Sequence, residues 1–522
     1  MTHKFLMISA VLITGLFVTF GGAAIAPFWG IPVFPDTMTG DVVRDTVKAG
    51  DVDDLYSKFH RIQDFKDRKY VLYISPGTYQ IRTSSVNSAL IVDSGAVNVV
   101  IRGLTGNPLD VRFRGIGFDT RDEDSCKHLF GFRDCSKITL AHVTFEDAGF
   151  NGISVSPTWE QRNLCIYNVH FYNIGERAIK VSGGALDTER AFEGEVKYCY
   201  FACDTVHPAG YYMNGDYIAA IDCMGLGTWV FRNNVFESIR GTTGGGRAAI
   251  FIWNHSSNVI VENNIIVNCD RSIAFGNPQN ATSFHVNDGI IRNNFVVAGV
   301  GRTMEICDAN RVKIYNNTIY TSRISGQPYT DAIYLENSAS VEIKNNIMTG
   351  NVSVNSGGFP DTSHNIHNTA VSWFSDVSTG NLHLTSQAEA VRDAGLVFPE
   401  ATEDIDGCLR DEHPDIGADE FGADGCGYSS INHRVPHAYQ STIFDFAIHP
   451  NPFNAHAVIH FTGKTGKAAI RIYDLKGSLV MVFPETAAET AIVDCSRLPA
   501  GLFIITAVMG TRVSSKKMCL IK

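Results

Sequence analysis

The sequence predicts an all-β solenoid, a coil in which each turn of the chain stacks on the turn before it. Asn-Asn pairs recur through the middle of the chain, and short strands of alternating apolar and polar residues surround them. A content of 47 glycines and 44% apolar residues suits a β-rich protein. Intervals of 30, 30, 23 and 29 residues separate the pairs, a period typical of one repeat; the pairs are Asn233-Asn234, Asn263-Asn264, Asn293-Asn294, Asn316-Asn317 and Asn345-Asn346.

The N-terminus has the pattern of a secretory signal peptide. Lys4 precedes an apolar run from Phe5 to Phe20, and the small residues that follow end in Ala24-Ile25-Ala26. The run is shorter than the roughly 20 apolar residues needed to cross a bilayer. We therefore expect residues 1–26 to be removed and the mature chain to have no membrane span.

Residues 41–66 begin the solenoid domain. They contain VDDLYSKFHRIQDF, whose spacing predicts a short amphipathic helix that covers the open edge of the first rung. With this cap, we expect the solenoid domain to span 41–421. A linker rich in Gly, Ser and His follows at 422–441, and 442–522 form a separate unit.

Charge and cysteine content limit the possible partners. The net charge of −11 argues against a broad surface for nucleic acid or anionic membranes, but permits an anionic substrate on a local basic patch. Among the 12 cysteines, Cys126/Cys135 and Cys408/Cys426 are near enough to close loops. Cysteines within strand patterns are interpreted as buried apolar residues; these are Cys165, Cys199 and Cys223. No His/Cys cluster has metal-ligand spacing, so no metal site is predicted.

The Asn pairs are interpreted as structural, because amides stacked at about 4.8 Å form hydrogen-bonded ladders in the turns of such coils. In this register, alternate residues of the second strand of each rung point inward, and on successive rungs they stack into two apolar columns. The first is Ile153, Ile179, Ile221, Ile250, Ile273, Met304 and Ile333; the second is Val155, Val181, Cys223, Ile252, Phe275, Ile306 and Leu335. The residues between them are predicted to face solvent as two outward columns. One is Ser154, Lys180, Asp222, Phe251, Ala274, Glu305 and Tyr334; the other is Ser156, Ser182, Met224, Trp253, Gly276, Cys307 and Glu336.

The outward columns contain a candidate site for a polyanionic sugar. Lys180 is predicted to lie beside Asp222, with Phe251 and Trp253 one rung further on. Arginines begin the same strands and histidines lie near their far ends; these are Arg177, Arg247, Arg271, His255 and His285. Arginines would neutralise a uronate carboxylate, aromatic rings would stack on sugars, and the lysine could accept a proton, although the neighbouring carboxylate opposes the lowered pKa that a lysine base needs. Alternatively, the Lys–Asp pair only decorates an exposed sheet, contributing about 0.2–1 kcal/mol.

Residues 67–421 resemble the right-handed parallel β-helix proteins of the pectate lyase-like superfamily. The segment LYISPGTYQI (72–81) is similar to their first strand, and DIDG (404–407) with DEHPDIGADEF (411–421) is similar to their closing segment. WNHSSNVIVENN (253–264), SIAFGN (272–277) and HVNDGIIRNNF (285–295) resemble a broad group of bacterial β-helix proteins.

GERAIKVSG (175–183) resembles the strand that carries the base lysine of the alginate lyase and chondroitinase B type of polysaccharide lyase. The resemblance assigns that role to Lys180. Those enzymes place an Arg-His pair on the next relevant strand, whereas FIWNHSSN (251–258) has Trp253 and Asn254 where the acid arginine is expected, so that His255 or Arg271 would have to substitute. Calcium as a cofactor is implied by this resemblance alone.

The last residues resemble the C-terminal sorting domain of type IX secretion substrates, a small β-sandwich. The segments that carry the resemblance are HPNPFN (449–454), IRIYDLKGSLV (470–480), SRLPAGLFIITAV (496–508) and KKMCLIK (516–522). The resemblance implies recognition by outer-membrane export machinery, and a location outside the cell or on the surface of a Gram-negative-type bacterium.

Three hypotheses of function stay open. Each of them expects a monomer whose partner is a polysaccharide and not a nucleic acid. The first is a lyase that cleaves uronate-containing polysaccharide by β-elimination. The second is a surface β-helix that binds glycan without turnover. The third is a glycoside hydrolase, for which Asp222 pairs with Asp216 or Glu305; the latter pair would be about 14 Å apart, too far for either hydrolytic mechanism.

Overall fold

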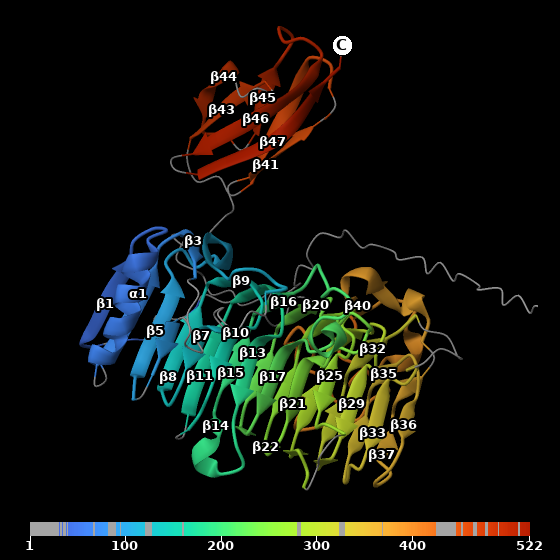
Figure 1. Ribbon diagram of the computed structural model, residues 1–522. Helices are drawn as coiled ribbons and strands as arrows, with labels where there is room; N and C mark the ends of the chain where they lie inside the picture. Colours follow the sequence, from blue (N-terminus) through green and yellow to red (C-terminus); the bar gives the residue numbers. More distant parts are fainter. Residues whose placement is uncertain are drawn as a thin grey trace, which may run out of the picture. The chain divides into compact units, whose positions relative to one another are not determined.

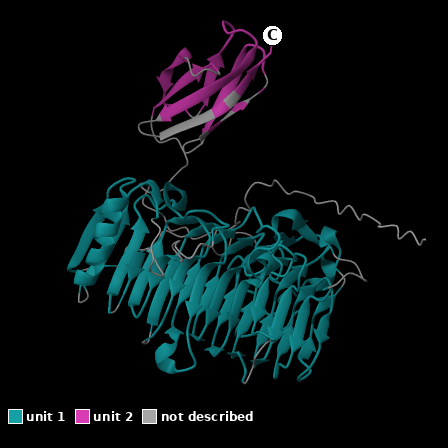
Figure 2. Cartoon of the chain, in the orientation of Figure 1, with its two compact units in different colours: residues 1–431 teal, residues 432–522 magenta. Residues whose placement is uncertain are grey.

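A computed structural model describes the chain in two compact units, residues 1–431 and 432–522, which are coloured separately in Figure 2. The described residues are 31, 34, 38, 40–65, 68–81, 90–93, 95–120, 128–158, 161–278, 283–322, 329–367, 369–423, 445–449, 451, 453–462, 467–474, 479–488, 490–509 and 512–521. The expected signal peptide and most of the expected linker lie outside them. The first unit is a right-handed parallel β-helix, as predicted (Figure 1).

Three parallel sheets, here called A, B and C, form the β-helix because each rung contributes to all three. Sheet A contains β1 (Val42–Val47), β2 (Lys69–Ile74), β5 (Val97–Gly103), β8 (Ser136–Ala141), β11 (Gln161–Tyr167), β14 (Ala191–Phe192), β15 (Glu195–Lys197), β18 (Leu226–Gly227), β19 (Val230–Arg232), β22 (Ser256–Ser257), β23 (Ile260–Glu262), β26 (Val286–Asn287), β27 (Ile290–Arg292), β30 (Ala309–Asn310), β31 (Lys313–Tyr315), β34 (Glu342–Lys344) and β37 (Asp361–Ser363).

Sheet B contains β3 (Gly77–Gln80), β6 (Val111–Arg114), β9 (Thr144–Ala148), β12 (His170–Ile174), β16 (Tyr200–Ala202), β20 (Val235–Glu237), β24 (Ile265–Val267), β28 (Phe295–Val297), β32 (Thr318–Tyr320), β35 (Ile347–Met348) and β38 (Ile366–His367). Sheet C contains β4 (Leu90–Val92), β7 (His128–Phe132), β10 (Asn151–Val155), β13 (Arg177–Ser182), β17 (Ala219–Met224), β21 (Ala248–Trp253), β25 (Ile273–Phe275), β29 (Met304–Cys307), β33 (Ile333–Glu336) and β36 (Val352–Val354).

The N-terminal cap contains the predicted helix and a strand that the sequence did not reveal. Helix α1 (Val52–Arg61) begins where the side chain of Asp51 accepts the backbone N–H of Asp54, and the short 3-10 helix η1 (Ile62–Phe65) continues it. Its buried Leu55 and Phe59 join the core of the coil. Strand β1 pairs in parallel with β2, so LYISPGTYQI spans parts of β2 and β3 and is not the first strand.

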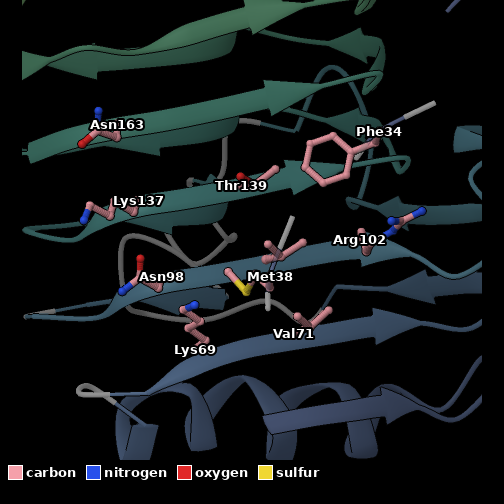
Figure 3. A pocket seen from close by; sticks show the side chains of 10 residues that line it. Phe34, Met38, Lys69, Val71, Asn98, Arg102, Lys137, Thr139 and Asn163 are labelled. Carbon is pink, nitrogen blue, oxygen red and sulfur yellow. The ribbon is translucent and has the colours of Figure 1, made fainter. Parts of the chain in front are cut away.

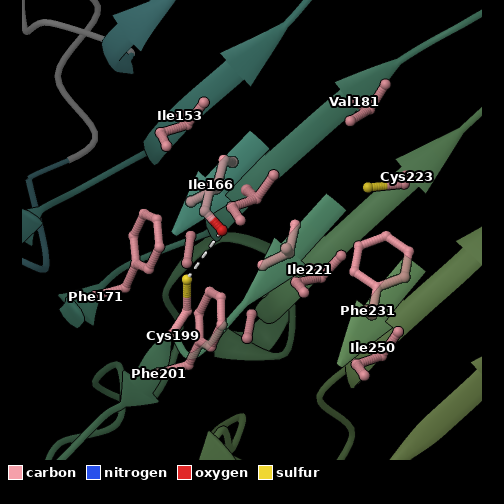
Figure 4. Packing of buried hydrophobic residues seen from close by; sticks show 14 of the residues in the cluster. Ile153, Ile166, Phe171, Val181, Cys199, Phe201, Ile221, Cys223, Phe231 and Ile250 are labelled. Atoms are coloured by element: carbon pink, nitrogen blue, oxygen red, sulfur yellow. Dashed lines mark hydrogen bonds between the residues drawn. The ribbon is translucent and has the colours of Figure 1, made fainter. Parts of the chain in front are cut away.

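The predicted register of the second strands is confirmed. In sheet C, Ile179 pairs with Ile221, which pairs with Ile250, and Val181 pairs with Cys223. Both inward columns lie in one continuous core, part of which Figure 4 shows with Phe171 and Phe201 stacked on neighbouring rungs. Apolar side chains of equal position therefore stack along the coil, which is how each rung buries a face that it could not bury alone.

The Asn pairs build a buried ladder. From Asn264 onward, the second Asn of each pair accepts the backbone N–H and the side-chain amide of the Asn on the previous rung, as Asn294 Oδ1 does from Asn264 at 3.0 Å for both bonds; Asn234 accepts the backbone N–H of Cys199. Asn365 extends this ladder by one rung beyond the pairs. The first Asn of each pair has positive φ, between 51° and 56°, which Asn tolerates better than most residues. The structural interpretation of the pairs is confirmed.

The described cysteines are mostly buried thiols. Cys199 and Cys223 are buried, as interpreted, whereas Cys165 is only partly buried. The Sγ of Cys199 lies 3.6 Å from the carbonyl oxygen of Ile166 (Figure 4). Cys135 is a free thiol, so the suggested Cys126/Cys135 pair is wrong. Cys408 is disulfide-bonded, and its partner lies outside the described residues.

The segment predicted to follow the last coil packs along the side of the coil, where Asn263 donates to the carbonyl oxygen of Asp404 and Asn316 donates to that of Asp415. A hairpin of β39 (Phe374–Asp376) and β40 (Asn381–Leu384) precedes it. The buried Asp404 and Asp415 accept backbone N–H groups of this segment, and the backbone of Gly417 donates to Asn345. Short 3-10 helices complete the unit: η2 (Pro108–Asp110), η3 (Asp187–Glu189), η4 (Tyr212–Gly215), η5 (Val371–Trp373), η6 (Val377–Thr379) and η7 (Glu389–Val391).

The second unit is a small antiparallel β-sandwich, as expected. One sheet contains β41 (Asp445–His449), β42 (His456–Thr462) and β45 (Thr490–Asp494); the other contains β43 (Ala468–Tyr473), β44 (Leu479–Thr486), β46 (Gly501–Met509) and β47 (Arg512–Leu520). It has its own apolar core. In the described part of the chain, the helices all lack the length and apolar character needed to cross a bilayer.

Candidate functional site

The candidate site lies on the outward face of sheet C, where β13, β17 and β21 are neighbours (Figure 1). Lys180 pairs with Asp222, and Asp222 pairs with Phe251. On the parallel column Met224 pairs with Trp253. The predicted adjacency of these residues is therefore present, because the alternation of each strand turns all of them away from the main core.

Asp222 is the centre of the cluster. Its Oδ1 accepts from Lys180 Nζ at 2.9 Å and from the indole N–H of Trp253 at 3.0 Å, and its Oδ2 accepts from Arg177 Nε at 2.6 Å. Burial alone would raise the pKa of Asp222, but the charges of Lys180 and Arg177 outweigh it and lower the pKa to about 2. Asp222 is thus an ionised anchor rather than a proton donor.

The expectation that this column faces open solvent is wrong. The side chains of Asp222 and Arg177 are each only 3% exposed, and Phe251 and Ala274 are buried as well. Phe251 and Ala274 form an apolar cluster separate from the main core, against which Trp253 packs. The column therefore forms a second packed layer on the outside of the sheet. The tip of Lys180, whose side chain is 15% exposed, and the half-buried Trp253 retain contact with solvent.

The aromatic residues of the site stack on one another. The rings of Phe251 and Trp253 are 5.3 Å apart and inclined by 8°, and His285 meets Trp253 edge-on at 5.8 Å. His285 is buried, and its Nδ1 accepts the backbone N–H of Asn254. Burial and this hydrogen bond position Trp253, so His285 supports the aromatic platform rather than lying open to a ligand.

The three predicted arginines differ in their partners. Arg177 lies with its Cζ 3.9 Å from the ring centroid of Tyr217. Arg271 forms an ion pair with Glu305 at 3.2 Å and donates to the carbonyl of Gly246 at 2.6 Å. Arg247 lies over Phe251, with its Cζ 5.9 Å from the ring centroid, and within the described residues it has no carboxylate partner. Burial and the nearby charges of Arg271 and Arg177 lower the pKa of Arg247.

His255 is not joined to the cluster. It lies in the turn after β21 with φ of 64°, half-buried. Each hydrogen bond of the Asp222 carboxylate to a described residue goes to Arg177, Lys180 or Trp253, and none goes to His255. The arrangement therefore gives no support to His255 as a catalytic partner of Lys180.

Three further residues extend the cluster beyond the sequence prediction. The aromatic Tyr217 precedes β17 and packs on Arg177, while the exposed Tyr212 meets Tyr217 edge-on at 5.3 Å. Arg302 pairs with Glu305 at 2.9 Å and lies two residues before its strand, as Arg271 does. Extending the arginine column by one rung would have found Arg302, whereas Tyr217 is in an irregular loop that has no repeat signal.

One cluster of possible metal ligands lies away from sheet C, in the closing segment. Ligand atoms of His383, Asp406 and Asp419 all lie within 4.8 Å of one another. His383 Nε2 contacts Asp406 Oδ2 at 2.9 Å, and Asp419 Oδ2 accepts the backbone N–H of Leu384 at 2.7 Å. These contacts account for the cluster as part of the closing structure. The sequence predicts no metal site here because His383, Asp406 and Asp419 are too far apart in the chain to show a ligand spacing.

One comparison with known proteins identifies the second unit. Residues 447–522 match the family of the secretion system C-terminal sorting domain, so the second unit is a sorting domain of an exported protein. The comparison with curated proteins finds no match.

Solved structures to which the chain is similar include two polygalacturonases and an alginate lyase. Endopolygalacturonase I from Stereum purpureum has 14% identity and a TM-score of 0.35, covering 63% of this chain and 100% of its own. An alginate lyase from Paenibacillus has 14% identity and a TM-score of 0.31, covering 62% and 99%. A polygalacturonase from Erwinia carotovora has 11% identity and a TM-score of 0.29, covering 64% and 100%. At these identities the likeness concerns the fold and assigns no activity.

Proposed function

We propose that the β-helix binds an acidic polysaccharide at the outward face of sheet C, around Arg247 and Trp253. The observation that carries the proposal is Arg247, a cation held among other cations without a carboxylate partner in the described part of the chain. A partly buried positive charge without a counter-ion costs free energy, and a bound anion would remove that cost. A carboxylate or sulfate of a glycan is such an anion.

The charge balance of the cluster supports an anionic ligand. Ion pairs join four cationic side chains to only two carboxylates, Asp222 and Glu305, and Arg247 is a fifth cation beside them; the four paired cations are Arg177, Lys180, Arg271 and Arg302. This concentration of cations contrasts with the net charge of −11 of the whole chain. A local positive potential on an acidic protein attracts anions to this face in particular.

The aromatic residues supply the second requirement of a sugar site. Trp253 lies beside Lys180, whose Nζ is 5.9 Å from the indole centroid, and its indole is held in place by the bond to Asp222. A fixed, half-buried indole offers an apolar surface at little entropic cost when a sugar ring packs on it. Tyr212, 42% exposed, offers a further aromatic surface next to Tyr217 and Arg177.

The test is binding of acidic and neutral polysaccharides by the full-length protein, measured by affinity electrophoresis and calorimetry. Arg247→Ala is expected to weaken binding of the acidic chain about tenfold or more, the loss of one charge-assisted contact of about 1.4 kcal/mol. Arg311→Ala is the matched control, because Arg311 is exposed and pairs with Asp288 on sheet A. Equal binding by wild type and Arg247→Ala would contradict the proposal.

A second candidate is β-elimination by the same site, which the position of Lys180 favours. A base would remove the proton next to a uronate carboxylate, the glycosidic C–O bond would break to leave a C=C bond, and the leaving oxygen would be protonated. The lysine must first lose its proton. Against this, the Lys180 ammonium is one of two cations that neutralise Asp222. Binding therefore has more support than catalysis.

Product analysis separates the two candidates. A lyase releases unsaturated sugars that absorb in the ultraviolet, and Lys180→Ala should abolish them while circular dichroism stays unchanged. A binding protein gives affinity without products. A hydrolase would release reducing ends without that absorbance. Of its three candidate carboxylates, Asp222 and Glu305 are held by cations, and Asp216 accepts the backbone N–H of Thr243 at 3.0 Å.

A further inference from the structure

A hollow of the first unit lies on sheet A, at the first rungs. Its volume is about 350 Å³, and the described residues that line it are Phe34, Met38, Lys69, Val71, Asn98, Val100, Arg102, Lys137, Thr139 and Asn163 (Figure 3). Among these described side chains three are cationic and none is acidic. On a chain with a net charge of −11, a groove lined by cations and amides requires an explanation.

One wall of the groove is a column in which lysine and asparagine alternate. The register of β2, β5, β8 and β11 places Lys69, Asn98, Lys137 and Asn163 at equivalent positions on four successive rungs. Figure 3 shows these side chains following one another from strand to strand. Rungs are about 4.8 Å apart, so the two ammonium groups are spaced by two rungs, with an amide between them.

The other wall combines an arginine with apolar groups. Phe34 and Met38 lie over the middle of the strands in Figure 3, with Arg102 on the side opposite the column. The Cζ of Arg102 is 5.7 Å from the ring centroid of Phe34. Arg102 Nε lies 3.5 Å from the carbonyl oxygen of Gly103, and among the described residues neither Arg102 nor the exposed Lys137 has an ion-pair partner. The groove thus presents charge on both sides and an apolar surface between them.

The groove ends at an acidic residue. On the next rung, Glu193 accepts from Asn163 at 3.0 Å and pairs with Arg162 at 3.2 Å. An anionic ligand extending along the rungs would meet this carboxylate after Asn163. An anionic ligand is therefore expected to cover the four rungs from Lys69 to Asn163.

We propose that this groove binds a short segment of an acidic polysaccharide, extended across the strands with one sugar residue per rung. A rung is about as long as one pyranose, so the two lysines would meet the carboxylates of alternate sugars and the asparagines the hydroxyls between them. Met38 and Phe34 would pack on the ring faces. The site is separate from the proposed site on sheet C and does not depend on it.

The experiment uses the full-length protein and two probes with the same backbone, hexagalacturonate and its methyl ester, which lacks the charges. Lys137→Glu is the test variant. Arg311→Glu is its control, because Arg311 occupies the same column of sheet A with the same φ of 54° and lies outside the groove. Both variants are made in the wild-type chain and in Arg247→Ala, which disables the site on sheet C.

The expected result is that Lys137→Glu weakens binding of hexagalacturonate about fivefold or more in both backgrounds, while Arg311→Glu leaves it within about twofold. The methyl ester should bind more weakly and respond to neither change. Equal loss for charged and esterified probes would overturn recognition of the charges.

The outcomes for the two sites are distinguishable. If Arg247→Ala removes all binding and Lys137→Glu has no effect in the wild-type chain, the groove is overturned and the site on sheet C stands. If Lys137→Glu weakens binding and Arg247→Ala does not, the site on sheet C is overturned and the groove stands. Absence of binding in the wild-type chain would overturn both.

Discussion

The Nζ of Lys180 lies 2.9 Å from Oδ1 of Asp222, and the two residues occupy paired positions on β13 and β17. Arg177 completes the neutralisation of the same carboxylate from the other side. Because the three charged groups satisfy one another inside a packed layer, they serve as a rigid base for the site. The groups left to meet a ligand are those at the edge of this layer, Arg247 and Trp253.

Removing the charge of Asp222 should strongly destabilise the first unit. Asp222→Asn leaves the buried guanidinium of Arg177 and the ammonium of Lys180 without their counter-ion, a change expected to cost about 3 kcal/mol or more. The free energy of unfolding, measured with guanidinium chloride, checks this. Asp288→Asn breaks an exposed pair with Arg311 and should cost under about 1 kcal/mol. A similar loss in both variants would contradict the role given to Asp222.

The pH dependence of the free energy of unfolding should reflect the ionisation of Asp222. The folded pKa of Asp222 is lowered to about 2 from the usual 3.8, so its stabilising contribution is full above about pH 5 and is lost as pH falls toward 2. The contribution is about 2 kcal/mol. The difference in unfolding free energy between wild type and Asp222→Asn should therefore shrink on acidification. A difference independent of pH between 5 and 2 would be inconsistent with an ionised, paired carboxylate.

The sequence was sufficient for the fold because the fold is a repeat. Two apolar columns, with Asn pairs on the rungs from Asn233 onward, determine the register of sheet C from Ile153 to Ile333, and the pairings between the columns were predictable. Strand β1 was not, since it occurs once and pairs at the edge, where no neighbouring repeat supplies a pattern.

The sequence predicts which residues of the site are neighbours, but it does not predict that they are buried. Alternation along a strand tells which side chains leave the core, and it correctly brought Lys180, Asp222 and Phe251 together. Whether outward side chains meet solvent depends on what covers the sheet, such as Tyr217 on Arg177, and those contacts come from loops of irregular length. The periodicity of the sequence does not predict these loop contacts.

The interior of the asparagine ladder should be more sensitive than its end. Asn294 accepts two hydrogen bonds from Asn264 and donates to Asn317, so Asn294→Ala leaves buried backbone groups unsatisfied. The expected loss is about 3 kcal/mol. Asn365→Ala, at the partly buried last position, should cost less. Guanidinium unfolding of the two variants checks the order, and equal losses would mean that the ladder does not contribute through its buried bonds.

The capping helix should stabilise the first rungs more than the candidate site. Phe59 is buried, and its ring meets Phe130 at 5.0 Å, so Phe59→Ala opens a cavity expected to cost about 3–5 kcal/mol locally. His60→Ala, on the exposed face of the same helix, is the control.

Hydrogen exchange followed by mass spectrometry should locate this loss. In a solenoid each rung contacts only its neighbours, so a defect at one end acts mainly on the rungs near it. Amides of β2, β5 and β8 should lose protection in Phe59→Ala, while those of β21, β25 and β29 stay protected. A uniform loss along the coil would show instead that the rungs unfold as one cooperative unit, and that the site on sheet C depends on the cap as much as the first rungs do.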